Sequence, residues 1–257
     1  QATVQAGSDR VVLQAASVRF ADRPPVLDSL DLRLGRGEFL SLLGASGCGK
    51  STVLRVMAGL QALSSGSRRC DASSVAFVFQ EPALMPWADL QANVGLPLRV
   101  AGQSREAMAS EVERVLQRVG LQGQEQALPH ELSGGMKMRA SIARALVMKP
   151  DLLLMDEPFA ALDDLTRHRL QDDLQQWWQA LGFSVCFVTH QVAEAVFMST
   201  RVAVMAPRGG QILRMIEIDE PFPRGEAFRR SARFHEICVA VSDAMASHPT
   251  HGGVMPA

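Results

Sequence analysis

The chain carries the stretch Gly44-Ala45-Ser46-Gly47-Cys48-Gly49-Lys50-Ser51-Thr52, which matches the phosphate-binding pattern G-x-x-x-x-G-K-[ST]. In such a loop, glycines let backbone N–H groups turn toward phosphate oxygens. Lys50 would contact the β- and γ-phosphates, and the Ser51 hydroxyl would bind Mg²⁺. Glu38–Leu43 predicts a short strand before the loop, and the residues from about Lys50 to Leu60 predict a helix whose positive end faces the phosphates. A structural glycine-rich turn is the alternative, and the flanking strand and helix favour a phosphate site.

A second feature is a buried strand that ends in two carboxylates. Leu152–Met155 is apolar, and Asp156 and Glu157 follow it directly. We expect Asp156 to hold Mg²⁺ through water, and Glu157 to polarise the water that attacks the γ-phosphate. A strand that simply ends in acidic surface residues is the alternative, and the phosphate loop in the same chain favours the catalytic interpretation.

Two further predicted strands end in polar residues: Val75–Phe79 leads into Gln80, and Ser184–Thr189 leads into His190. In open α/β sheets, ligands bind at the carboxyl ends of the strands. The sequence therefore predicts that four strand ends meet at one edge of a sheet. These ends carry, in chain order, Gly44, Gln80, Asp156 with Glu157, and His190.

The rest of the chain predicts strands at both ends and helices between them. Leu84–Lys149 shows helical periodicity, with an amphipathic helix over Ser104–Val119 that places Met108, Val112, Val115 and Val119 on one face. Ser64–Ser74 is small and polar, which predicts a loop, and Asp22–Pro25 predicts a turn. The other expected strands are Val11–Phe20, Val26–Leu34, Arg201–Ala206 and Gln211–Ile218, and the other expected helices are Ser133–Met148, Thr166–Leu181, Gln191–Met198 and Glu226–Met245. We expect the tail, Ala246–Ala257, to be disordered.

Composition excludes several classes. Lys plus Arg is 26 and Asp plus Glu is 27, so a net charge of −1 argues against nucleic acid as a partner. Cys48, Cys70, Cys186 and Cys238 are far apart, which predicts reduced cysteines and no zinc site. The sequence has no apolar run of roughly 20 residues and no apolar stretch at its start, so we expect a soluble cytosolic protein that can dock on a membrane.

Leu132-Ser133-Gly134-Gly135 stands ahead of a predicted helix and about twenty residues before the acidic pair. Together with the phosphate loop, it resembles the ATP-binding subunit of ABC transporters over roughly residues 11–240. The resemblance implies an α/β P-loop NTPase core of the ABC ATPase type with an inserted helical subdomain and an antiparallel β subdomain. We expect a single domain over 11–245, with the nucleotide-binding core at 11–84 and 150–218, the helical signature subdomain at 85–149 and a C-terminal helical segment at 219–245.

The resemblance also implies how ATP is held. Two such subunits would pair head to tail as a homodimer, with each ATP between the phosphate loop of one and Ser133, Gly134 and Gly135 of the other. Phe20 would stack on adenine, Gln80 would contact Mg²⁺ and sense the membrane subunit, and His190 would contact the γ-phosphate. Ala160-Ala161-Leu162-Asp163 matches the loop that links the two sites across the dimer. Met136 departs from the usual Gln, and we expect activity to survive because that position lies past the γ-phosphate contact.

Two stretches narrow the resemblance to importers of the nitrate, sulfonate and taurine class. They are Met85-Pro86-Trp87 with Asn93-Val94, and Glu131–Arg139 running to Ile142–Leu146. The implied partners are transmembrane permease subunits and, indirectly, a solute-binding protein, on the cytoplasmic face of the inner membrane. Trp87 is either a docking residue or a packing residue, and we expect Trp177 and Trp178 to pack rather than to form a site.

Other ATPase classes fit less well. A DNA-repair ATPase would need a long coiled-coil insertion between Gly44 and Asp156, and a translation factor would need two cassettes. A phosphate-loop kinase would leave Ser133–Gly135 and His190 unexplained. A catalytically inactive module is at odds with the presence of Glu157. Cys48 lies beside Lys50 at a helix N-terminus, which predicts a lowered pKa and inactivation by thiol alkylators.

Overall fold

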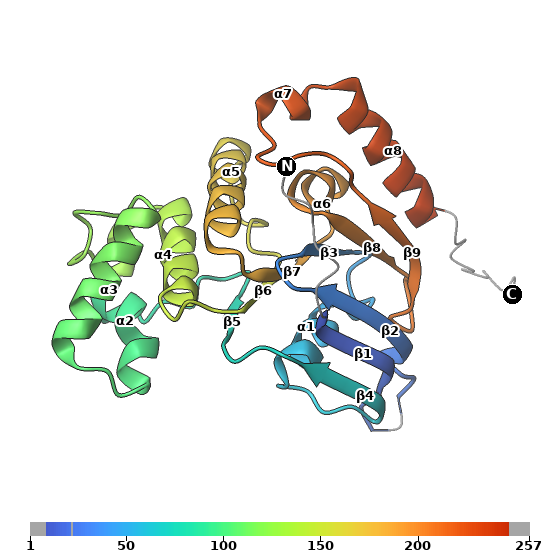
Figure 1. Ribbon diagram of the computed structural model, residues 1–257, viewed down its shortest axis with the longest axis horizontal. Helices are drawn as coiled ribbons and strands as arrows, with labels where there is room; N and C mark the ends of the chain where they lie inside the picture. The colour runs from blue at the N-terminus through green and yellow to red at the C-terminus, as the bar shows by residue number, and fades with distance from the viewer. Residues whose placement is uncertain (1–8, 22, 247–257) are drawn as a thin grey trace, which may run out of the picture. The chain divides into compact units, whose positions relative to one another are not determined.

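The computed structural model describes residues 9–21 and 23–246 (Figure 1). Its strands are β1 (Asp9–Val18), β2 (Leu27–Gly35), β3 (Phe39–Leu43), β4 (Ser65–Cys70), β5 (Val75–Val78), β6 (Leu152–Asp156), β7 (Ser184–Thr189), β8 (Arg201–Met205) and β9 (Ile212–Glu217). Its helices are α1 (Lys50–Ala58), α2 (Leu90–Val100), α3 (Arg105–Arg118), the 3-10 turn η1 (Pro129–Glu131), α4 (Gly134–Leu146), α5 (Asp164–Leu181), α6 (Val192–Met198), α7 (Glu226–Arg229) and α8 (Ala232–Ala246).

The chain divides into two compact units. Of the described residues, the first unit holds mainly Asp71–Phe187 with Gly35–Glu38, and the second holds Val11–Leu34, Phe39–Cys70 and residues 188–246. One sheet has six strands in the order β5-β6-β7-β3-β8-β9, and the other has three in the order β2-β1-β4. Mixed sheets with helices confirm the predicted α/β class.

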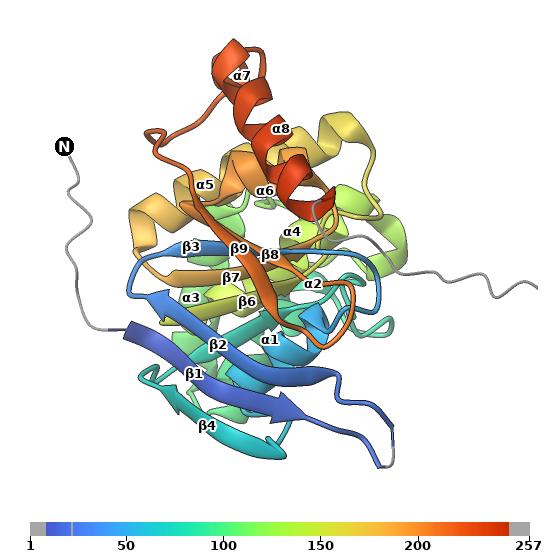
Figure 2. The same ribbon diagram turned by 90° about the vertical axis from the view of Figure 1, so that its right-hand side faces the viewer.

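The three-stranded sheet corrects one prediction. Within the predicted loop 64–74, residues 65–70 form the strand β4, which pairs antiparallel with β1 over Val11↔Cys70 to Ser17↔Ser65 (Figure 2). The strand reads Ser-Gly-Ser-Arg-Arg-Cys and is largely exposed, so it lacks the alternation of apolar residues that marks a half-buried strand. Pairing with a neighbouring strand decides its conformation.

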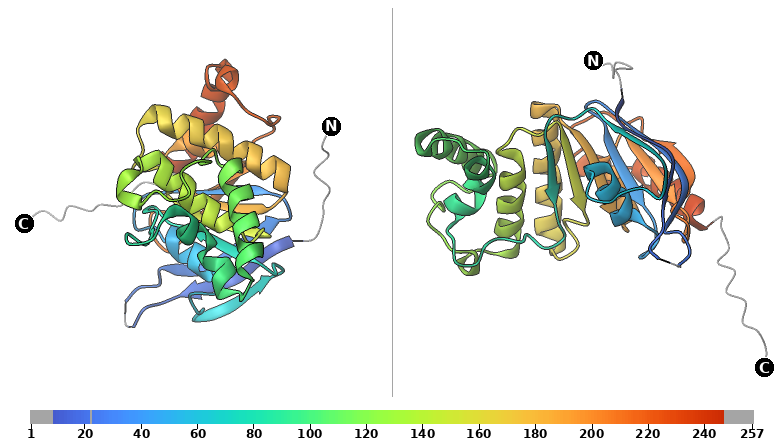
Figure 3. Two further views of the ribbon diagram at one scale, coloured as in Figure 1. Left: turned by 90° about the vertical axis from the view of Figure 1, so that its left-hand side faces the viewer. Right: turned by 90° about the horizontal axis from the view of Figure 1, so that it is seen from below.

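In the first unit, β5 and β6 run parallel, from Val75↔Leu152 to Val78↔Met155. Helices α2, α3 and α4 pack on one another, and α4 also contacts α5 and β5 (Figure 3). Helix α3 confirms the predicted amphipathic helix, with Ser104 as its N-cap. Its buried face holds Val112 and Val115, while Met108 is only half-buried.

In the second unit, β3 runs parallel to β8, β8 runs antiparallel to β9, and α8 packs against α6, β8 and β9. The predicted helix Glu226–Met245 is two helices, α7 and α8. Ser231 separates them, because its hydroxyl donates to the Phe228 carbonyl at 2.8 Å and accepts from the Phe234 N–H at 3.0 Å. A side chain that bonds the backbone at a helix end competes with helix continuation.

The described residues contain no helix that is both long and apolar enough to cross a membrane. All four cysteines are free, as predicted. The predicted disorder of the tail concerns residues 247–257, which lie outside the described part of the chain, as does Asp22 of the predicted turn.

Candidate active site

The phosphate loop connects β3 to α1 in the second unit, as the sequence predicts. Its last glycine, Gly49, is the N-cap of α1 and has a φ of 110°. A Cβ there would lie 2.9 Å from Leu27 Cδ2 and 3.1 Å from the Val26 carbonyl oxygen, so only glycine fits. Helix α1 has no side-chain cap. The first N–H groups of α1 are therefore not bonded by an N-cap side chain, which suits an anion site.

Lys50 is buried within this loop. Its Nζ donates to the carbonyl oxygens of Gly44 and Ala45, at 2.8 Å and 2.9 Å. These charge-assisted bonds hold the ammonium group beside the backbone of the loop. Ala45, Ser46 and Gly47 are exposed, while Ser51 and Thr52 are half-buried.

Cys48 does not have the lowered pKa that its position predicts. Its side chain is 1% exposed. Burial raises the pKa of the Cys48 thiol, and the opposing charge of Lys50 is the smaller effect. A raised pKa makes the thiol less reactive than its position predicts, and inactivation by alkylators stays a prediction.

The acidic pair lies in the first unit at the end of β6. Because β5 and β6 are parallel neighbours, Gln80, two residues after β5, and Asp156, the last residue of β6, belong to the carboxyl ends of adjacent strands. Asp156 and Glu157 are half-buried and Gln80 is exposed. Glu157 has a φ of 45°, a left-handed conformation that is uncommon for residues other than glycine. Such strain often marks a functional position.

The loop after Glu157 is held by α5. The Arg167 guanidinium donates to the carbonyl oxygens of Phe159 at 3.4 Å and Leu162 at 2.7 Å. Asp163 is the N-cap of α5 and accepts from the Thr166 N–H at 3.0 Å. That bond lowers the pKa of the exposed Asp163 carboxyl.

Ser133 is the N-cap of α4, as predicted, and its hydroxyl accepts from the Met136 N–H at 3.3 Å. Ser133 and Gly134 are exposed. A Cβ on Gly135 would lie 2.5 Å from Thr166 Cγ2. Any larger residue at position 135 would therefore displace the Thr166 side chain within the first unit, a constraint that the sequence did not reveal. Met136 contributes its N–H to the cap, and any residue except proline could do so.

Two predicted contact residues of the second unit are exposed. Phe20 follows β1 and is 44% exposed, an unusual state for a large aromatic ring. His190 follows β7 directly. The prediction that these residues meet those of the first unit at one sheet edge stays a prediction.

Asn93 on α2 holds the backbone of the chain between Gln80 and α2, which we call the Gln80 segment. The sequence did not reveal this structural role. Its side chain is fully buried, accepts from the Met85 N–H at 2.7 Å and donates to the carbonyls of Ala88 and Asp89 at 2.9 Å and 3.0 Å. These hydrogen bonds fix the backbone on both sides of Trp87, which is 80% exposed. Trp87 is therefore not a packing residue within this chain.

Arg144 on α4 also holds the Gln80 segment. It donates to the carbonyls of Ala83 and Pro82, at 2.8 Å and 2.9 Å. Trp177 and Trp178 are buried, and the Trp177 N–H donates to the Arg118 carbonyl at 3.2 Å, which confirms packing for this pair. The sequence could not reveal the hydrogen bonds of Arg144 and Trp177, because their partners are backbone carbonyls far away along the chain.

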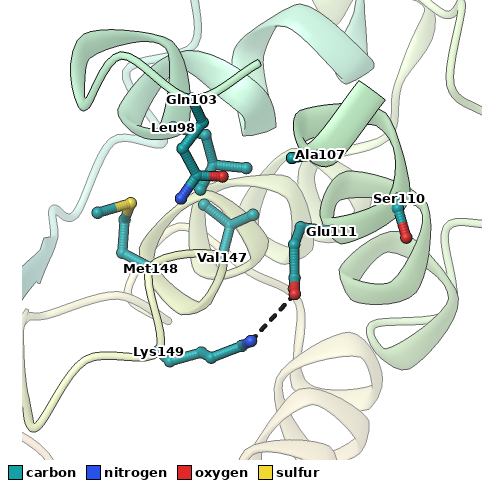
Figure 4. Close-up of a pocket in the computed structure, with 8 residues that line it drawn as sticks. All are labelled: Leu98, Gln103, Ala107, Ser110, Glu111, Val147, Met148 and Lys149. Atoms are coloured by element: carbon teal, nitrogen blue, oxygen red, sulfur yellow. Dashed lines mark hydrogen bonds and ion pairs between the residues drawn. The ribbon is translucent and has the colours of Figure 1, made fainter. Parts of the chain in front are cut away.

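Two pockets lie in the helical part of the first unit, apart from the predicted site residues. The first has a volume of about 340 Å³ and is drawn in Figure 4, where Lys149 forms an ion pair with Glu111 at 3.0 Å. The second has a volume of about 470 Å³ and lies along α2 and α3. Neither is lined by a residue predicted to bind ATP.

Comparison with known proteins supports the same class. The family described as ABC transporter matches residues 27–160, more than half of the chain. A taurine import ATP-binding protein of Burkholderia pseudomallei is 40% identical over 90% of this chain and 95% of its own length. An aliphatic sulfonates import ATP-binding protein of Xanthomonas axonopodis is 42% identical, over 88% of this chain and 94% of its own.

Two solved structures agree in fold. CbiO1 of Clostridium perfringens, part of an ABC transporter complex, superposes with a TM-score of 0.77 at 25% identity, over 91% of this chain and 99% of its own. The ATP-binding cassette MJ0796, a dimer in a post-hydrolysis state with ADP and Pi, gives a TM-score of 0.72 at 27% identity, over 82% of this chain and 100% of its own.

The fold, the phosphate loop and these likenesses define an ATP-hydrolysing α/β protein. The chain belongs to the ABC transporter family.

Proposed function

We propose that this chain is the energy-coupling subunit of an importer for small organic anions of the taurine and sulfonate class. The observation that carries the proposal is the phosphate loop with its buried lysine, joined in one chain to a carboxylate pair at the end of β6. The names of the relatives support the solute class.

In the proposed site, the phosphate loop binds the phosphates of ATP and Phe20 stacks on adenine. Glu157 accepts a proton from the water that attacks the γ-phosphorus. Lys50 and His190 stabilise the negative charge that develops on the transferred phosphoryl group. Chemistry of this kind depends on positioning and charge, which suits side chains held on strand ends and helix starts.

The proposed metal site takes oxygen donors from Ser51, Gln80 and Asp156. A hydroxyl, an amide oxygen and a carboxylate are the donors that Mg²⁺ prefers, so these residues fit the ion. The described residues contain no cluster of three or more His, Cys, Asp or Glu that would favour a different metal. When bound, Mg²⁺ neutralises phosphate charge and orients the leaving group.

A second copy of the chain would complete each site. Ser133, Gly134 and Gly135 at the start of α4 would contact the γ-phosphate bound to the partner's phosphate loop, where a helix N-terminus favours an anion. Asp163, which already caps α5, would lie at the same interface. The dimeric cassette with ADP and Pi supports this arrangement.

The permease would dock on the first unit at the segment after Gln80. Trp87 supports this assignment because an exposed indole on a fixed backbone is typical of a contact surface. We place the subunit on the cytoplasmic face of the inner membrane, with a solute-binding protein as an indirect partner.

The first test is MgATP hydrolysis by the wild type and by Glu157→Gln, with size-exclusion runs in ATP. We expect kcat to fall by about 10²–10⁴-fold in the variant, because a general base contributes that much, while ATP-dependent dimers persist. A variant that hydrolyses ATP as fast as the wild type would remove Glu157 from the mechanism.

The solute class needs the assembled transporter. With the permease in vesicles and the solute-binding protein present, taurine or an aliphatic sulfonate should stimulate hydrolysis, and the Glu157→Gln complex should not respond. Stimulation by an unrelated solute alone, such as a sugar, would contradict the proposed class but not the ATPase site.

A further inference from the structure

The turn that carries His190 is held by a buried pair of side chains. Thr189, the last residue of β7, is 1% exposed, and Glu194, on the first turn of α6, is 5% exposed. The Thr189 hydroxyl donates to the Glu194 carboxylate, and it accepts from the Gln191 N–H at 3.0 Å. His190 is therefore an exposed residue between two buried anchors.

These two side chains lie at the start of α6. Gln191 is the N-cap of α6, but its side chain makes no capping bond. The Thr189 hydroxyl bonds the N–H of Gln191 itself, and the Glu194 carboxylate lies in the first turn, where the helix dipole favours negative charge. A buried carboxylate is stable only when donors surround it, and the Thr189 hydroxyl is one of them.

We propose that Thr189 and Glu194 are positioning residues for His190. The inference rests on the proposed contact of His190 with the γ-phosphate. The pair restricts the backbone on both sides of His190 to one conformation, and in that conformation the imidazole can contact the phosphate. Positioning of this kind affects the rate more than the binding of ATP, because the misplaced group acts on charge that develops during the reaction.

The test compares Thr189→Val, which keeps the shape but removes the hydroxyl, with Thr189→Ser, which keeps the hydroxyl. We expect kcat to fall by about tenfold to a hundredfold in Thr189→Val, since small misplacements of a reacting group cost that much. KM for ATP should stay within about twofold of the wild type, and Thr189→Ser should restore most of kcat. A Thr189→Val variant with normal kcat, or a Thr189→Ser variant as slow as Thr189→Val, would overturn the inference.

A double-variant cycle separates positioning from general stability. In a His190→Ala background, Thr189→Val should cause no further loss of kcat, because its effect passes through the imidazole. An equal loss in both backgrounds would overturn the inference and assign the pair to the fold alone. A His190→Ala variant with wild-type kcat would instead contradict the proposed role of His190, so the two failures are distinguishable.

Discussion

The N-termini of α1 and α4 differ in how their first backbone N–H groups are capped. Helix α1 begins after a glycine-rich loop and α4 begins with two glycines, and both are assigned to phosphate in the proposed function. Helix α1 starts from Gly49 with no capping side chain, whereas α4 starts from Ser133, whose hydroxyl bonds the Met136 N–H. The first helix lacks a side-chain cap, and the second carries its own.

The difference shows how each end is kept stable before a nucleotide binds. At α1 the buried Lys50 ammonium bonds two loop carbonyls, so the loop is shaped by charge. At α4 the cap and the close contact of Gly135 with Thr166 hold the segment by packing. We expect α1 to depend on ATP far more than α4 does, because an uncapped helix start gains most from an anion.

The largest effect is expected for Lys50→Ala. The ATP affinity should fall by about tenfold to a hundredfold, because a charged hydrogen bond is worth about 1.5–3 kcal/mol. Isothermal titration with ATP measures the change. Arg55→Ala is the matched control, since Arg55 is an exposed cation on the same helix. An equal loss of affinity in both variants would mean that the charge of α1 as a whole, rather than Lys50, binds the phosphates.

Gly135→Ala should lower the free energy of unfolding by about 1–3 kcal/mol, the usual cost of overpacking. The added Cβ would lie 2.5 Å from Thr166 Cγ2, and Thr166→Ser removes that methyl group. The double variant should therefore recover most of the stability in urea unfolding. If it does not, contact with Thr166 is not the reason that residue 135 is glycine.

Ser133→Ala should cost about 1 kcal/mol of stability through loss of the cap. Ser133→Asp keeps a capping oxygen and should keep the stability, yet it places a negative charge where the γ-phosphate of the partner's ATP is proposed to bind. Urea unfolding and ATP hydrolysis should thus separate in Ser133→Asp. Normal hydrolysis by this variant would argue that α4 does not meet a phosphate.

The smallest effect concerns Cys48. At pH 7 its thiol should react with N-ethylmaleimide much more slowly than in urea, because burial raises its pKa and blocks access. The pKa of the Cys48 thiol is higher in the folded protein than in the unfolded chain. The free energy of unfolding should therefore fall as the pH rises above the pKa of the unfolded thiol, because there the unfolded state loses its proton while the folded state keeps it. Fast alkylation of the folded protein would show that the loop opens.

Local chemistry explains what the sequence predicted and what it missed. The strand, loop and helix around Lys50 follow from a contiguous motif, and Ser133 and Asp163 were recognised from short patterns that the structure shows as caps. The strand β4 was missed because its polar residues pair with a segment some fifty positions away in the chain. The pKa of Cys48 was predicted in the wrong direction because burial is set by the packed loop and not by the neighbouring residue Lys50.

The exposure of Trp87 also means that the intrinsic fluorescence of the chain can report binding. The sequence holds three Trp and no Tyr, so emission excited at wavelengths that phenylalanine does not absorb comes from the indoles alone. Trp87 is 80% exposed, whereas Trp177 and Trp178 are 6% and 8% exposed. Iodide should quench one emitting population and leave the other bright, and Trp87→Phe should abolish the quenchable part. Binding of any partner that covers the segment between Gln80 and α2 should then shift the Trp87 emission to shorter wavelength and reduce its quenching by iodide, so that no added label is needed.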